Sequence, residues 1–284
     1  MSENSTISWC HHTFNAWSGC SRVSEGCRFC YAENALPSMR RFAAWGANAE
    51  RKHASEAYWR DPIKWDRAAT AAGERHRVFS ASMSDVFEAR DDLDSARARL
   101  FTLIEATPNL DWLLTTKRTE EIMRRVPAHW RAAFPKNVWM IASVEDQATA
   151  DKRIPELLRV PAWVRGLSME PLLGPIDLDP PTCQYCGENG WNIGVANDGA
   201  TPWCTECRSE AAYGLWLNGC AGPTVPGINW IITGGESGPR ARRAEVEWFR
   251  DIHRQAGVHG VEVHHKQMGA AWAQEVQEIG RAHV

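Results

Sequence analysis

Short apolar segments rich in β-branched and aromatic residues recur along the chain, with polar segments between them. The clearest lie at residues 77–82, 110–116, 137–143, 162–168, 228–235 and 261–267. Several are apolar at nearly every position, as strands buried on both faces of a parallel sheet are. Helical patterns separate most of them; residues 92–108, for example, begin at aspartates and carry apolar residues at helical spacing. This alternation predicts an α/β fold with parallel strands.

Each apolar segment ends in small or polar residues. The endings are SMSD at 82–85, TTKR at 115–118, SVED at 143–146, SMEP at 168–171, GGESG at 234–238 and KQMG at 266–269. One such ending is ordinary for a helix cap or a turn, because Ser, Asp and Gly serve both. Six in succession favour a polar cavity, because the loops after the strands build the active site of a parallel α/β barrel. We therefore expect a partial, open parallel α/β barrel with its site at that face.

Composition limits where the protein acts and what it binds. The chain has 284 residues, of which 44% are hydrophobic, and a net charge of -3. It contains no apolar run of about 18 residues and no visible secretory signal, so we expect no membrane contact and a cytoplasmic location. In that reducing compartment, nine cysteines favour metal or cluster ligation over disulfides. With a pI near 6.4, any nucleic-acid binding must use a local patch.

One stretch breaks the alternation of strands and helices. About sixty residues separate the strand expected to end at Ser168 from the strand expected to begin at Ile228, more than an ordinary connection contains. Two C-x2-C pairs stand seventeen residues apart within it, namely Cys183 with Cys186 and Cys204 with Cys207. This spacing predicts one zinc ion held by four thiolates, and an auxiliary iron–sulfur cluster is the alternative.

The same stretch sets the expected domain boundaries. Proline-containing segments flank the cysteine pairs, as hinges of an inserted module would. We expect residues 1–176 and 227–284 to form the barrel, and residues 177–226 to form a zinc-ribbon-like module inserted into it. Cys220 stands apart from both pairs and fits a small buried apolar residue better than a ligand.

Three more thiols share the stretch GCSRVSEGCRFCYAE, namely Cys20, Cys27 and Cys30. A structural zinc ion takes four protein ligands, and Cys10, His11 or His12 could complete such a site. The alternative is a [4Fe–4S] cluster held by three thiolates, with its fourth iron open to an outside ligand. S-adenosylmethionine could bind that iron, and reductive cleavage of its sulfonium would yield a carbon radical.

The cysteine pattern and the strand-end blocks together resemble a known family. The pattern W-x-G-C-x6-C-x2-C-Y-A spans residues 17–32, and SMSDVF, LLTTKR, ASVEDQ, SMEPLLGPIDL, IITGGESGPRAR and KQMG follow it in order. These blocks resemble phage-encoded proteins of largely unknown function that carry a three-cysteine, radical-SAM-like motif. The resemblance implies a [4Fe–4S] cluster, S-adenosylmethionine, a reductant for the cluster and, for a phage protein, the host cytoplasm.

The radical SAM pattern also implies site residues. Its usual form is C-x3-C-x2-C, whereas the first gap here has six residues. Phe29 occupies the aromatic position before the last cysteine and would shield the cluster. The residues implied for cofactor binding are Phe29, Ser82, Ser84, Asp85, Ser143, Glu145 and Ser168. The candidates for catalysis are Glu170, Glu236 and Lys266.

A further set of residues is a candidate for substrate binding. In GGESGPRARR, a glycine-rich turn precedes arginines that could hold a phosphate, although a solvated basic helix start has the same composition. Fifteen tryptophans, including Trp17 and Trp203 beside cysteine motifs, are compatible with gripping an unstacked base. The candidates are Lys117, Arg118, Ser237, Arg240, Arg242 and Arg243.

Two functions of different classes follow from these features. The first is a radical SAM enzyme that modifies or isomerises a nucleotide or a DNA base. The resemblance to phage proteins suggests an isomerase or mutase in the hypermodification of thymine. The second is a non-catalytic, zinc-dependent nucleic-acid-binding protein that uses both cysteine motifs and the arginines.

Overall fold

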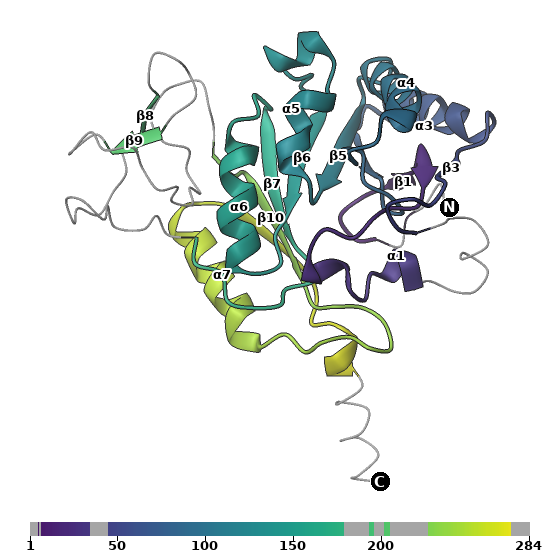
Figure 1. Ribbon diagram of the computed structural model, residues 1–284. Coiled ribbons are helices and arrows are strands. Elements are labelled where there is room, and N and C mark those ends of the chain that lie inside the picture. The colour runs from purple at the N-terminus through teal and green to yellow at the C-terminus, as the bar shows by residue number, and fades with distance from the viewer. Residues whose placement is uncertain are drawn as a thin grey trace.

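The computed structural model describes Ser5 and residues 7–34, 45–178, 193–195, 202–204 and 227–273. Across these residues, seven parallel strands form one curled sheet (Figure 1). In sheet order they are β1 (His12–Phe14), β4 (His76–Ser80), β5 (Leu110–Thr116), β6 (Val138–Ser143), β7 (Val164–Met169), β10 (Trp230–Gly234) and β11 (Glu262–Gln267). Sheet order equals chain order, so each strand lies beside the next and the sheet curls into a half-barrel. This confirms the predicted open parallel α/β barrel.

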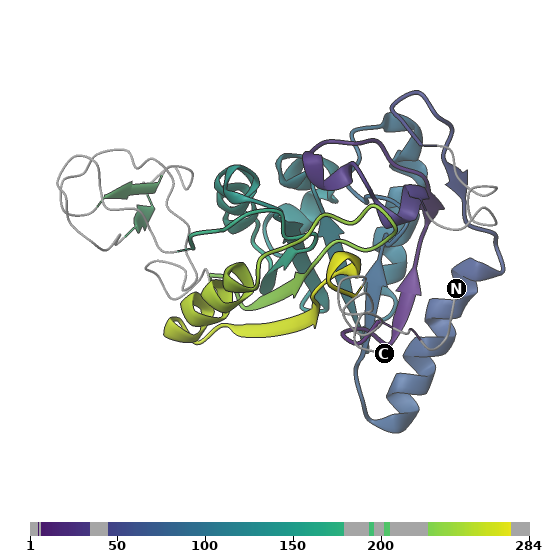
Figure 2. The same cartoon turned by 90° about the horizontal axis from the view of Figure 1, so that it is seen from below.

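The longer α-helices cover the outside of this half-barrel (Figure 2). The α-helices are α1 (Tyr31–Asn34), α3 (Asp61–Ala72), α4 (Asp94–Glu105), α5 (Ile122–Arg125), α6 (Gln147–Leu158) and α7 (Val246–Val258). Short 3-10 helices are η1 (Glu25–Cys27), η2 (Tyr58–Arg60), η3 (Asp91–Leu93), η4 (Thr119–Glu121) and η5 (Ala128–Arg131). Among the described helices, none is long and apolar enough to cross a bilayer.

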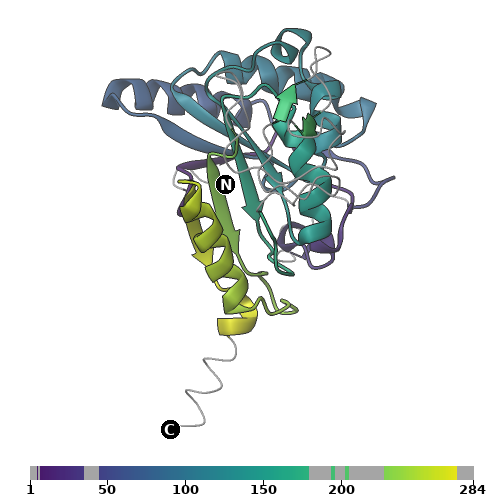
Figure 3. The same ribbon diagram turned by 90° about the vertical axis from the view of Figure 1, so that its left-hand side faces the viewer.

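Local sequence explains where these helices begin and end. Asp146 caps α6 by accepting a hydrogen bond from the Thr149 backbone, and the Thr149 hydroxyl accepts one from the Asp146 backbone. Gly73 ends α3 in the left-handed conformation, with a φ of 69°. Phe249 of α7 packs edge-on against His265 of β11, which fixes this helix over the last strand (Figure 3).

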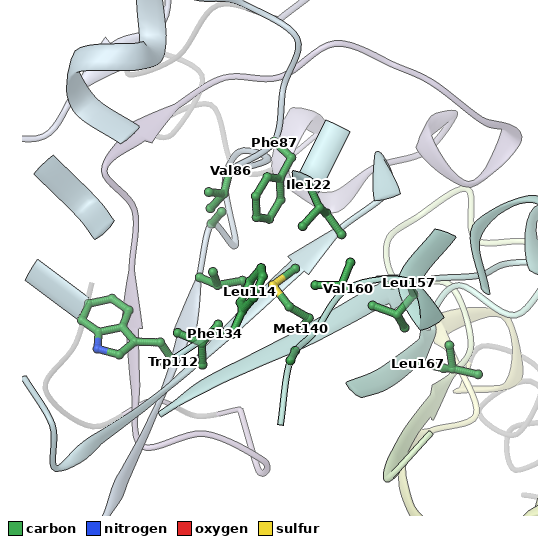
Figure 4. Packing of buried hydrophobic residues seen from close by; sticks show 14 of the residues in the cluster. Val86, Phe87, Trp112, Leu114, Ile122, Phe134, Met140, Leu157, Val160 and Leu167 are labelled. Atoms are coloured by element: carbon green, nitrogen blue, oxygen red, sulfur yellow. The ribbon is translucent and has the colours of Figure 1, made fainter. Parts of the chain in front are cut away.

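The outer face of the sheet buries apolar side chains against the helices. Trp112, Leu114, Met140 and Leu167 point to this side and are completely buried (Figure 4). The concave face of the sheet is also apolar in the half away from the strand ends. Leu113, Ile141 and Ile232 lie together there in a second buried cluster. Burial on both faces explains the nearly continuous apolar segments in the sequence.

The chain before β1 fills the floor of the concave face. Trp9 packs on Phe79 with ring centroids 4.6 Å apart, and on Trp230 at 6.1 Å. The Ser8 hydroxyl and His264 Nε2 lie 2.9 Å apart, which joins this segment to the far edge strand β11. The N-terminal segment therefore spans the concave face between the two edge strands of the described sheet, and it leaves the upper half, where the strands end, open.

Two short antiparallel pairs complete the described structure. β2 (Trp17–Ser18) pairs with β3 (Lys52–His53), and β8 (Ile193–Val195) pairs with β9 (Pro202–Cys204). The second pair and residues 177–178 are the parts of the expected inserted module that the structure describes. Cys183, Cys186, Cys207 and Cys220 lie outside the described residues, so the zinc site and the domain boundaries stay predictions.

Gly235 allows two strand-end loops to touch. A Cβ atom at this position would lie 2.1 Å from the Met268 carbonyl oxygen, in the backbone after β11. We predict that Gly235→Ala lowers the free energy of unfolding by about 1–3 kcal/mol, because the backbone must move apart. Gly257→Ala is the control, since a Cβ there meets nothing within 4 Å. It should change stability by less than about 1 kcal/mol in urea unfolding, and equal losses in both variants would contradict this account.

Candidate functional site

A cavity of about 360 Å³ lies where the parallel strands end. The three-cysteine loop forms one side of it and the strand-end residues form the other. It brings together most of the residues singled out in the sequence: Cys20, Cys27, Phe29, Cys30, Ser82, Ser84, Asp85, Lys117, Arg118, Ser143, Ser168, Glu170, Glu236, Ser237 and Lys266. Their convergence follows from the parallel sheet, which puts every strand end on one rim. The role of each residue stays a prediction.

The three thiols enter this cavity from one loop. Cys27 is buried, and Cys20 and Cys30 are partly buried. Within the described part of the chain, no group of three or more His, Cys, Asp or Glu side chains is placed to hold a single metal ion. The thiolates of a [4Fe–4S] cluster bind different irons and need not converge on one point. The thiolate donors of this loop are of the chemical type that iron–sulfur clusters take.

The residues that could have completed a zinc site lie elsewhere. The Cys10 thiol packs in the floor of the half-barrel and donates to the Ser5 hydroxyl at 3.5 Å. His12 Nε2 lies 3.1 Å from Nδ1 of His76, and the His11 ring stacks on the same His76 at 4.8 Å. None of the three described candidates, Cys10, His11 and His12, lines the cavity.

Cys20 lies in a buried, charged setting. Burial raises the pKa of its thiol to about 12; the Asp85 carboxylate adds to this shift and the Arg118 guanidinium opposes it. Without a bound cation the thiol is thus protonated at neutral pH. A metal centre would have to displace this proton on binding, as thiolate ligation requires.

Asp85 serves the protein framework through all its described contacts. Its carboxylate accepts hydrogen bonds from the Thr116 hydroxyl at 2.7 Å, the Phe87 backbone at 2.9 Å, the Lys117 backbone at 3.1 Å and Arg118 Nη1 at 2.9 Å. Four donors leave little capacity for a ligand. The cofactor-binding role expected for Ser82, Ser84 and Asp85 stays a prediction.

Glu145 lies beneath the cysteine loop and is fully buried. It accepts hydrogen bonds from Lys117, from Arg153 Nη1 at 2.8 Å and from the Ser24 hydroxyl at 3.1 Å. A Cβ on Gly26 would lie 2.5 Å from its Cγ, so the loop can approach only with glycine there. These contacts support the loop, and the cofactor-binding role that we expected for Glu145 stays a prediction.

Two ion pairs form the far wall of the cavity. Lys266 Nζ lies 2.6 Å from Glu170 Oε1, and both side chains are partly exposed to the cavity. Glu236 is buried and accepts from the backbone and guanidinium of Arg242 at 2.8 and 2.9 Å. Arg242 also donates to the Glu25 carboxylate at 3.0 Å, so it links this wall to the cysteine loop.

The arginines after the glycine-rich turn gather at aromatic rings outside the cavity wall. The guanidinium groups of Arg240 and Arg242 lie 4.9 and 5.2 Å from the centre of the Phe29 ring. Arg243 lies 4.3 Å from the Trp272 ring. Gly235 of the turn serves close backbone contact, and Arg242 is engaged in ion pairs. A phosphate-binding role for the arginines stays a prediction.

Several cavity residues received no role from the sequence. Tyr31 follows Cys30 directly, lines the cavity and donates to the Ser82 carbonyl at 2.6 Å. Its position within the cysteine motif is the sequence feature that could have identified Tyr31 as a site residue. Glu88 and Arg51 form a buried ion pair at 2.7 Å beside the loop, and nothing local in the sequence marks them as partners.

Comparison with known proteins gives a family and a set of distant structures. A family model described as "Protein of unknown function (DUF5131)" matches residues 4–283, and no curated protein sequence matches the chain. A cysteine-to-serine mutant of spore photoproduct lyase is similar at 14% identity and a TM-score of 0.42, over 59% of this chain and 48% of that one. A double mutant with bound AdoMet and dinucleoside spore photoproduct has 14% identity and a TM-score of 0.41, with the same coverage. The chain thus spans about half the length of these structures.

The buried charge of Glu145 predicts a pH-dependent loss of stability. Burial alone would raise its pKa, but Lys117 and Arg153 outweigh this effect and lower it. Its stabilising contribution is therefore complete above its unfolded pKa of about 4.3 and disappears as the pH falls through the lower folded pKa. Glu145→Gln should cost about 3 kcal/mol at neutral pH, because it leaves buried cations unpaired.

Urea unfolding of both proteins at neutral and acidic pH measures this difference. The gap between wild type and Glu145→Gln should narrow below about pH 4. The control is Glu247→Gln, which removes an exposed pair with Arg250 and should cost at most about 0.5 kcal/mol. A gap that stays constant down to the lowest pH would contradict the assignment of a lowered pKa.

Proposed function

Because the chain belongs to the DUF5131 family, whose description names no activity, we propose a function from its site: it is a radical SAM enzyme. Cys20, Cys27 and Cys30 hold a [4Fe–4S] cluster, and S-adenosylmethionine binds beside it in the same cavity. One observation carries this proposal, namely that three thiols from one loop face the polar strand ends across a cavity of about 360 Å³. When bound, the cluster would supply an electron that cleaves the sulfonium and releases an adenosyl radical.

The residues around the thiols suit the binding of a zwitterionic nucleoside. Ser82, Ser84, Ser143 and Ser168 offer hydroxyls that donate or accept hydrogen bonds to amino, carboxylate and ribose groups. Phe29 lies next to Cys30 in the cavity wall and covers this side with an apolar ring. The apolar floor around Trp9 excludes water from the bottom of the cavity. The electrostatic contacts of the polar groups that line the cavity are therefore stronger than in water.

The paired charges of the far wall suit proton transfer and charge binding. Lys266 Nζ lies 2.6 Å from Glu170 Oε1, so the pair places a hydrogen-bond donor and an acceptor side by side in the cavity wall. Arg242 pairs with Glu236 and holds its carboxylate at the cavity. We assign Glu170, Glu236 and Lys266 as the candidates for catalysis.

The substrate we propose is a nucleotide or a base in DNA. Support comes from Phe29 and its neighbouring Arg240 and Arg242, an aromatic and cationic group beside the cavity. Lys117, Ser237 and Arg243 remain candidates for substrate contacts. A thymine-modifying isomerase, a phage origin, the host cytoplasm, the zinc of the inserted module and the reductant rest on the sequence alone.

Anaerobic reconstitution with iron and sulfide tests the proposal. We predict a brown protein with about four irons per chain, as one [4Fe–4S] cluster requires, that converts S-adenosylmethionine to 5′-deoxyadenosine and methionine when reduced. Cys27→Ala should abolish the visible absorption and the cleavage, because one iron loses its thiolate.

The matched control is Cys10→Ala, since Cys10 is also buried but packs in the floor. It should retain the cluster and the cleavage. Cluster loss in Cys10→Ala as complete as in Cys27→Ala would contradict the three-cysteine site. Stoichiometric zinc at the first motif, with no cleavage of S-adenosylmethionine, would favour a non-catalytic zinc protein.

A further inference from the structure

The loop between Cys20 and Cys27 is longer than the pattern that it resembles. Six residues separate the two cysteines, and η1 (Glu25–Cys27) is the one helical turn described within the loop. A longer and less regular loop has more conformations, so presenting two thiols in fixed positions costs more entropy. The protein must therefore restrain the loop by contacts from outside it.

Charged side chains from the strand ends supply these contacts. Arg118, which follows β5, donates from Nη2 to the Ser21 carbonyl at 2.7 Å and to the Ser21 hydroxyl at 2.9 Å. Glu145 accepts from Ser24 at 3.1 Å, and Arg242 donates to the Glu25 carbonyl at 3.1 Å. Each contact holds a different part of the loop.

Arg118 also reaches the sulfur of a proposed ligand. Its Nη1 lies 3.6 Å from Cys20 Sγ, within hydrogen-bond distance for sulfur, and donates to Asp85 at 2.9 Å. The side chain is 5% exposed, so water cannot replace these partners. A guanidinium can serve Ser21, Cys20 and Asp85 at once because its N–H groups form a fixed planar fork.

The charges around Arg118 are balanced before any ligand binds. Arg118 and Arg51 face Asp85 and Glu88, all four are buried, and Glu88 pairs with Arg51 at 2.7 Å. A thiolate at Cys20 would add a negative charge directly against Arg118. Buried hydrogen bonds and positive charge at a ligand sulfur stabilise the reduced, more negative state of an iron–sulfur centre.

We propose that Arg118 is a positioning residue that holds Cys20 in its ligand orientation and sets the electron affinity of the iron bound there. The positioning part concerns the metal-free chain, and the redox part rests on the proposed function. This assignment replaces the substrate-binding role expected for Arg118, because its described partners all belong to the loop and the surrounding network. It also explains how a loop with six residues between Cys20 and Cys27 can hold the Cys20 thiol in a fixed position.

The test compares Arg118→Lys with Arg51→Lys. Both variants keep a buried positive charge in the same network, and both lose the guanidinium fork. Arg51 donates to Glu88 and to the carbonyls of Gly46 and Ala49, whereas Arg118 donates to the Cys20 sulfur. It is therefore the matched control for direct contact with the sulfur.

Two readouts are needed, and neither is activity. In the metal-free protein, hydrogen–deuterium exchange of residues 19–27 should become faster in Arg118→Lys, with no change in α3. In the reconstituted protein, the cluster midpoint potential from an EPR-monitored titration should shift to a more negative value in Arg118→Lys. The Arg51→Lys variant should keep the wild-type potential.

Each outcome decides part of the inference. Equal potential shifts in the two variants would overturn the specific role of the Arg118 contact with the Cys20 sulfur, and unchanged exchange in Arg118→Lys would overturn the positioning role. If the wild type takes up no cluster, the proposed function fails, while the exchange data still decide the positioning role. Should Arg118→Lys not fold, the double variant Arg118→Gln with Asp85→Asn removes both partners and replaces it in both measurements.

Discussion

The direction and order of the strands control everything else in this structure. All strands of the main described sheet run parallel and follow chain order, so each strand-end loop reaches the same rim. The N-terminal segment fills the lower half of the concave face with Trp9 and its neighbours. What remains is a cavity with an apolar floor and polar walls, and the cysteine loop forms one side of it.

The cavity walls carry many charges, and pairing makes their burial tolerable. Lys117 with Glu145, Arg118 with Asp85, and Arg242 with Glu236 each combine one group near the cavity with a partner behind or beside it. Burying an unpaired charge costs roughly several kcal/mol, whereas burying a paired and hydrogen-bonded charge costs far less. The same pairs connect the cysteine loop to the strand ends, so electrostatics and the shape of the site depend on the same side chains.

The sequence predicted the parts of this site that local patterns determine. Recurring short apolar segments located six of the seven strands in the described sheet, but β1 (His12–Phe14) was too short to stand out. The strand-end residues were found for the same reason, since each directly follows an apolar run. The partners of Glu145, Arg118 and Arg242 were not found, because long-range pairs leave no periodic signal. Gly26 received no role from the sequence and Gly235 was interpreted as part of a turn, although a close contact explains each glycine.

The central claim is that the three cysteines leave one iron open inside the cavity. Electron–nuclear double resonance of the reduced, reconstituted protein tests it directly, with S-adenosylmethionine labelled at its amino nitrogen. The account predicts a hyperfine coupling between that nitrogen and the cluster, because the amino group would bind the open iron. A cluster whose spectrum does not change when S-adenosylmethionine is added would contradict the account.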